Sequence, residues 1–171
     1  MLENEDTFIG KTPGCIGHAL QPSGCVGGGE RIGGLGAEAV VYLNPALAAR
    51  AKHVRKMTTQ LPSKMRFIAA QFNALLHDDL WLRLAANANR AAARLYAAVK
   101  DLPGVHLDLA PQMNSIYPVL PAEAIETLQQ WSFFWNWDVA RHQVRWMAAW
   151  DSTDEDVDRF VAGVRRALVH K

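Results

Sequence analysis

Arg66 is the side chain whose position in the sequence favours a chemical role. It falls in the first turn of a helix predicted by the apolar spacing of residues 65–76, directly after Pro62-Ser63 and Lys64. Backbone N–H groups in the first turn of a helix have no partner within that helix, and they attract anions. The sequence therefore predicts an anion-binding position at Arg66.

No familiar catalytic pattern accompanies this arginine. The sequence has no G-x-S-x-G, no P-loop, no Ser/His/Asp spacing and no conspicuous pair of carboxylates. Cys15 and Cys25 do not form a C-x-x-C pair, and the six histidines lack metal-ligand spacing, so we expect free thiols and no metal site. A basic cluster is better interpreted as a solvated helix face than as an anion patch. It consists of Lys52, His53, Arg55 and Lys56.

The overall charge argues against two classes of partner. Eighteen basic and 17 acidic side chains leave a formal charge of +1, which indicates neither a nucleic-acid partner nor an anionic membrane surface. No apolar run approaches the roughly 20 residues that a membrane-spanning helix needs. The amino terminus, MLENEDTFIG, is acidic and does not resemble a secretory signal. We therefore expect a cytoplasmic location.

The first hundred residues predict a helical arm that follows a glycine-rich segment. Residues 1–36 hold ten of the twelve glycines without apolar periodicity, which predicts loop or disorder. Residues 37–100 predict one strand (37–43), a helix beginning at Pro45, and two tandem helices separated by His77-Asp78-Asp79. The second of these tandem helices carries a long apolar stripe. Its members are Leu80, Leu84, Ala88, Ala91, Leu95 and Val99.

Residues 101–171 predict a small α+β domain. A capping box at Ser152-Thr-Asp-Glu155 opens a final helix with a regular apolar stripe. Alternation along strand 143–150 places Arg145 on the face opposite Trp146 and Trp150. Five of the six tryptophans lie after residue 130. Packing in the core or between subunits explains this enrichment better than a carbohydrate-binding site or an aromatic cage does. The other expected elements are strands at 105–109, 113–120 and 131–137 and a helix at 121–130. The predicted fold is therefore α+β, with a helical arm leading into a small antiparallel sheet that helices cover on one face.

Several of these motifs resemble one enzyme family. The stretch LGAEAVVYLNPALAARAKHVRKMTTQLPSKMRFIAAQF and the strand QVRWMAAW with the following DSTDEDVD are similar to the C-terminal half of the low-specificity threonine aldolases. These enzymes are β-eliminating lyases of the fold-type I pyridoxal phosphate group. The resemblance extends from Gly27 onward and implies that Arg66 contacts the cofactor phosphate, that Arg145 pairs with the substrate carboxylate, and that Asn114 starts a small-domain strand.

One position departs from the family pattern. In the family, the lysine that binds the cofactor lies in a motif like S-F-G-G-T-K-N-G. At the matching place this chain has VGGGERIG, from Val26 to Gly33. Arg31 occupies the place of the lysine, and a permanently protonated guanidinium is a poor nucleophile toward an aldehyde. At most, Arg31 holds pyridoxal phosphate without a covalent bond. Lys64 is the nearest spare lysine, but a polar helix start does not promise the burial that would activate it.

Two functions are consistent with this resemblance, and a third interpretation is an α+β domain in which the two arginines lie on the surface by coincidence. In the first, the chain is a truncated aldolase homologue that is inactive alone, because aldol cleavage of β-hydroxy-α-amino acids to glycine and an aldehyde needs the lysine and the missing large domain. An amino acid would then bind only once a large domain completes the site. In the second, it is a non-enzymatic interaction module. A homo-oligomer is expected, because an arm that normally packs on large domains leaves apolar stripes uncovered.

Overall fold

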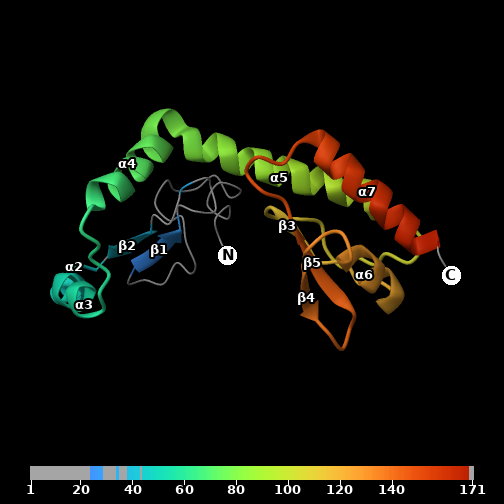
Figure 1. Ribbon diagram of the computed structural model, residues 1–171, viewed down its shortest axis with the longest axis horizontal. Coiled ribbons are helices and arrows are strands. Elements are labelled where there is room, and N and C mark those ends of the chain that lie inside the picture. The colour runs from blue at the N-terminus through green and yellow to red at the C-terminus, as the bar shows by residue number, and fades with distance from the viewer. Residues whose placement is uncertain (1–23, 29–33, 35–37, 43, 170–171) are drawn as a thin grey trace. The chain divides into compact units, whose positions relative to one another are not determined.

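The computed structural model describes residues 24–28, 34, 38–42 and 44–169 (Figure 1). The chain divides into two compact units, residues 1–85 and 86–171. We describe each unit by itself.

The first unit begins with a pair of antiparallel strands. β1 (Gly24–Gly28) pairs with β2 (Glu38–Tyr42), with Gly24 opposite Tyr42. The strand β2 agrees with the sequence prediction, whereas β1 lies in a segment predicted to be loop or disordered, so that prediction is wrong for these five residues. Backbone pairing with β2 provides the hydrogen bonds of β1, and a glycine-rich strand has no side-chain periodicity that a sequence pattern could detect.

Two short helices replace the single helix predicted to begin at Pro45. α2 (Pro45–Ala48) starts with proline at its first position, and the side chain of Asn44 caps it by accepting a hydrogen bond from Ala46 N at 3.0 Å. α3 (Ala51–Met57) begins anew after Arg50, which makes no side-chain cap. The two helices are separated by one turn and bury none of their residues.

The two tandem helices are present and separate where the sequence predicts. α4 (Met65–Leu76) is followed by a 3₁₀ turn, η2 (His77–Asp79), and by α5 (Leu80–Val99). Asp78 has a φ of 48°, a left-handed conformation that an aspartate tolerates better than most residues and that breaks the helix. A small apolar cluster surrounds this break. Its members are Leu75, Trp81, Leu82 and Leu84.

The second unit contains a three-stranded antiparallel sheet in the order β3-β5-β4. The strands are β3 (Ser115–Ile116), β4 (Trp135–Asp138) and β5 (Gln143–Met147). Ile116 lies opposite Trp146, and Trp135 lies opposite Arg145, so the central strand fixes the position of both edge strands.

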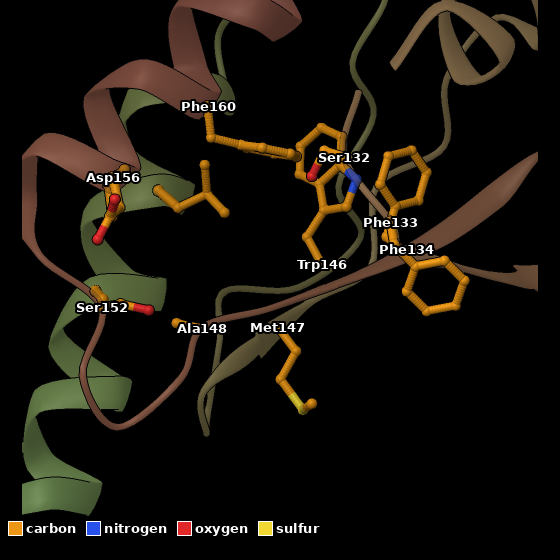
Figure 2. A pocket seen from close by; sticks show the side chains of 12 residues that line it. Ser132, Phe133, Phe134, Trp146, Met147, Ala148, Ser152, Asp156 and Phe160 are labelled. Carbon is orange, nitrogen blue, oxygen red and sulfur yellow. The ribbon is translucent and has the colours of Figure 1, made fainter. Parts of the chain in front are cut away.

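Helices cover one face of this sheet and enclose the main core. The covering helices are α6 (Ala122–Gln129), α7 (Asp154–Val169) and the part of α5 that follows Ala86 (Figure 1). Val144 and Trp146 of β5 point into the core, and Figure 2 shows Trp146 and Met147 on opposite sides of this strand. Other fully buried core members are Val99, Ile116, Leu128 and Val164. The predicted α+β fold is confirmed.

Some predicted boundaries are wrong. The expected strand at residues 105–109 is reduced to an isolated bridge between His106 and Val119. The aromatic strand expected from Trp131 begins four residues later, at Trp135, because the preceding residues turn after α6. Phe134 is nevertheless buried, and its ring meets that of Trp146 edge to face at 6.1 Å.

The N-terminus of α7 is capped one residue later than predicted. Thr153 Oγ1 accepts a hydrogen bond from Asp156 N at 3.1 Å, and the Asp156 carboxylate accepts one from Thr153 N at 3.1 Å. This is a capping box with aspartate in place of glutamate. Ion pairs then connect α7 to α5, with distances of 2.6 Å between Arg90 and Asp154 and 2.8 Å between Arg94 and Asp158.

The capping box makes a pH-dependent contribution to stability. Hydrogen bonds from the side chain and backbone of Thr153, together with the Arg159 guanidinium, lower the pKa of Asp156 in the folded state. A lowered folded-state pKa means that the stabilisation is present above the unfolded pKa of about 4 and is lost as the pH falls through the folded pKa. We expect Asp156→Asn to lower the melting temperature at pH 7 and to approach the wild type as the pH falls through the lowered folded-state pKa of Asp156.

Thermal melts followed by circular dichroism between pH 2 and 7 measure this difference. Asp151→Asn is the matched control, because Asp151 is exposed and forms no ion pair with any described residue. A gap between Asp156→Asn and the wild type that stayed constant down to the lowest pH would contradict the assignment.

Candidate functional site

Arg145 is the most unusual polar residue of the second unit, because its side chain is charged and only 8% exposed. It lies in the middle of β5, on the face of the sheet opposite the core. Its Nη2 donates to the Met147 thioether sulfur at 2.9 Å and is 3.5 Å from the Ser115 hydroxyl oxygen. The guanidinium also lies over the Trp137 ring, 5.9 Å from its centroid.

The guanidinium has no counter-charge among the residues that the structure describes. No Asp or Glu of this part of the chain forms an ion pair with Arg145, and its buried Nε has no hydrogen-bond partner there. Burying a charge without pairing it is unfavourable, and the neutral sulfur and hydroxyl around Arg145 compensate only weakly. This arrangement suits an anionic ligand that would supply the missing negative charge.

Exposed aromatic side chains surround this arginine. Trp135 is 64% exposed and lies directly opposite Arg145 in the sheet, while the Tyr117 and Trp137 rings meet edge to face at 5.0 Å. The sequence correctly placed Arg145 away from Trp146 but missed its contact with Trp137, which comes from the neighbouring strand. We refer to Tyr117, Trp135, Trp137, Arg145 and Met147 together as the Arg145 face.

Asn114 lies beside this sheet at the start of β3. Its Nδ2 donates to Ala148 O at 2.9 Å, and Ala148 N donates to Asn114 O at the same distance, so the side chain extends the pairing between β3 and β5. The Asn114 Oδ1 atom is buried without a hydrogen-bond partner. This residue therefore offers one acceptor that a ligand or water could use.

Arg66 occupies the helix position that the sequence predicts. It lies in the first turn of α4, is exposed, and has its guanidinium 5.4 Å from the centroid of the Phe67 ring. The N-cap residue Lys64 makes no side-chain cap, and in the described ranges no carboxylate pairs with Arg66. The arrangement fits an oxyanion such as a phosphate. Arg31, the other predicted cofactor contact, lies outside the described residues.

Two cavities of the second unit are lined by residues other than Arg145, although Met147, which contacts Arg145, lines the first. The cavity in Figure 2 has a volume of about 150 Å³ and is lined mainly by apolar side chains of α5, β5 and α7. Its Ser152 and Asp156 already serve the loop and cap before α7. A second cavity of about 350 Å³ is lined by Glu126, Asp138 and His142 among others.

Two further findings bear on expected ligands. Across the described ranges, no three or more His, Cys, Asp or Glu side chains are grouped so that they could hold a metal ion. None of the described helices is long and apolar enough to cross a membrane.

Comparison with known proteins first gives the class of this chain. It is 33% identical to the low-specificity L-threonine aldolase of Pseudomonas aeruginosa over 169 residues, 98% of this chain and 48% of that protein. It is 31% identical to the enzyme of the same name from another Pseudomonas strain, with the same coverage. The chain is thus similar, along nearly its whole length, to low-specificity threonine aldolases.

The solved structures agree with this class. A threonine aldolase from Leishmania major matches with a TM-score of 0.74 and 26% identity, over 84% of this chain and 43% of that one. No family model matches the sequence. The chain is a homologue of the low-specificity threonine aldolases and is related to a C-terminal half of such an enzyme. It spans about half the length of the curated relatives it matches.

The alignment also corrects one sequence-based expectation. The resemblance was expected to begin at Gly27, whereas the match to the Pseudomonas enzymes covers 98% of the chain and thus includes most of the glycine-rich segment before it. The roles of Arg31, Arg66 and Arg145 stay predictions, since the comparisons concern whole sequences and not these side chains.

Proposed function

We propose that this chain is the C-terminal half of a threonine-aldolase-type lyase and that Arg145 receives the carboxylate of a β-hydroxy-α-amino acid. The supporting observation is the buried guanidinium, which has an unpartnered Nε and no counter-charge among the described residues. A carboxylate would form charge-assisted hydrogen bonds with it. The similarity to threonine aldolases along nearly the whole chain supports the same reaction class.

Pyridoxal phosphate is the cofactor that this proposal implies. When bound, it would act as the electron sink for cleavage of the bond between the α and β carbons of the amino acid. Arg66 would hold the phosphate, because it lies in the first turn of α4 and its side chain is exposed. Arg31 would contribute charge but no covalent bond, since a guanidinium stays protonated.

Inactivity of the chain alone is part of the proposal. Arg31 stands in the place of the cofactor lysine, and the chain corresponds to about half of each curated relative. Both features remove groups that the reaction needs, so the chain would require a large domain from elsewhere and a lysine in the cofactor position.

A non-enzymatic interaction module is the alternative function. It is favoured by the number of large apolar side chains that the described residues expose. Examples on the second unit are Phe133, Trp135, Val139 and Met147. Exposed apolar area of this kind marks contact surfaces on many proteins. Concentration-dependent self-association in sedimentation, without binding of any carboxylate, would favour this alternative over the lyase.

Borohydride reduction tests the proposal directly. Incubation of the purified chain with pyridoxal phosphate followed by borohydride should label no single lysine stoichiometrically, and L-threonine should not be converted to glycine and acetaldehyde. The P. aeruginosa relative, treated in parallel, is the positive control. Stoichiometric labelling of one lysine, located by peptide mass spectrometry, would overturn the role given to Arg31.

A further inference from the structure

We propose that the Arg145 face selects carboxylates that bear an aromatic ring, with the carboxylate displacing the Met147 sulfur from Arg145. This inference rests on the proposed function, because it specifies the class of ligand for the same guanidinium. It concerns only residues of the second unit.

The carboxylate position follows from the hydrogen bonds of Arg145. Its Nε has no partner, and its Nη2 donates at 2.9 Å to the Met147 sulfur, which is a weak neutral acceptor. A carboxylate accepts charge-assisted bonds from two guanidinium nitrogens at once. Ser115 Oγ, 3.5 Å from Nη2, is a further polar contact beside this position.

Met147 is able to leave this position. Its side chain is 53% exposed and unbranched, so its three torsions can move the sulfur aside without disturbing the core. The core contacts of this strand are made by Val144 and Trp146, on the other face of the sheet. Met147 therefore acts as a movable cover whose removal exposes the guanidinium.

The aromatic part of the ligand follows from the rings that flank the guanidinium. Trp135 is paired with Arg145 across β4 and β5, and Trp137 lies two residues further along β4, 5.9 Å from the guanidinium carbon. The Tyr117 ring packs edge to face against the Trp137 ring, with 5.0 Å between the ring centroids. A flat ring attached to the bound carboxylate can reach the exposed surface of these indoles. A favourable aromatic contact should tighten binding roughly three- to tenfold over an aliphatic carboxylate.

Titrations with four small molecules test this inference on the full chain. We would follow the indole N–H signals of the tryptophans by NMR while adding phenylacetate, acetate, L-threonine or the neutral benzyl alcohol, each to about 50 mM because one charge-assisted contact gives millimolar affinity. Phenylacetate should bind roughly three- to tenfold more tightly than acetate. Benzyl alcohol should not saturate.

Three variants assign the effect to individual side chains. Arg145→Gln should abolish binding of phenylacetate, acetate and L-threonine, whereas Arg141→Gln, which removes an exposed arginine paired with Asp108, should leave it unchanged. Trp137→Leu should lower the affinity for phenylacetate to that for acetate. Met147→Ala should tighten the binding of every carboxylate, because no sulfur then competes for Nη2.

The outcomes separate this inference from the proposed function. Equal affinities for phenylacetate and acetate, both abolished by Arg145→Gln, would overturn the aromatic preference and leave Arg145 as a carboxylate site. Binding of no carboxylate, or carboxylate binding that survives Arg145→Gln, would overturn both. If benzyl alcohol bound saturably and as tightly as phenylacetate, the claim that the guanidinium binds the carboxylate of the ligand would be overturned.

Discussion

Arg145→Met should stabilise the second unit by about 1–2 kcal/mol while it abolishes carboxylate binding. The wild-type guanidinium is 8% exposed, lacks a counter-charge among the described residues, and leaves Nε without a partner. Methionine is shorter than arginine, but it is unbranched and flexible and can occupy part of the same space between Met147 and Trp137 without an unpaired charge. The lost contacts are a hydrogen bond to a sulfur, one at 3.5 Å to a hydroxyl, and the cation–π contact with Trp137 at 5.9 Å, and together they compensate only in part for the buried charge.

Urea denaturation followed by tryptophan fluorescence measures this change in stability. Five of the six tryptophans lie after residue 130, so the signal reports mainly on the second unit. Arg141→Met is the matched control, because its side chain is 53% exposed and its ion pair with Asp108 contributes little, so we expect a change within about 0.5 kcal/mol.

If Arg145→Met lowered the free energy of unfolding by more than about 1 kcal/mol, the contacts of Arg145 would stabilise the fold by more than the burial of its charge destabilises it. Gained stability together with lost binding is the pattern of a residue retained for function at the expense of the fold. The same experiment therefore separates a ligand-binding arginine from one that only supports the sheet.

Regular side-chain periodicity explains why much of the second unit could be predicted. In α7, the apolar residues Val157, Val161 and Val164 recur at helical spacing and are all buried, as the sequence suggested. In β5, alternation alone placed Val144 and Trp146 on the core face. These elements bury enough apolar surface for the pattern to determine their orientation.

Elements held mainly by backbone or local polar contacts were predicted less well. β1 has no side-chain pattern, and the capping box of α7 moved to Thr153 because Ser152 instead accepts a hydrogen bond from Ala149 N. Asp151, Ser152 and Thr153 precede this helix, and each has a side chain that can cap a helix. The sequence alone does not show which of them does so.

Only part of the candidate site could be predicted from the sequence. Strand alternation gave the side of the sheet that holds Arg145, but its neighbour Trp137 depends on the pairing of β4 with β5, which has a register irregularity between Asn136 and Asp138. Arg31 and Arg66 were assigned through the family resemblance, because one arginine at a helix start or in a glycine-rich segment has no specific spacing of its own.

The second large effect is expected for Leu128→Ala in the core of the second unit. Leu128 lies on α6, is 0% exposed, and belongs to the cluster that also contains Ile116, Val144 and Val164. Truncation removes buried methyl groups and leaves a cavity that the surrounding helices and sheet can fill only in part. We therefore expect a loss of about 2–5 kcal/mol in the free energy of unfolding.

The chain offers a matched control for this substitution, because Leu109→Ala removes the same atoms from a side chain that is 77% exposed. Leu109→Ala should change stability by less than about 0.5 kcal/mol, whereas Leu128→Ala should lower the melting temperature by roughly 10–30 °C. Melting curves recorded by tryptophan fluorescence provide the comparison. Equal and small effects of the two substitutions would mean that α6 does not pack on the sheet in solution. In that case the assignment of a helix-covered core that keeps β5 in place, with Arg145 on the outer face of the sheet, would be wrong.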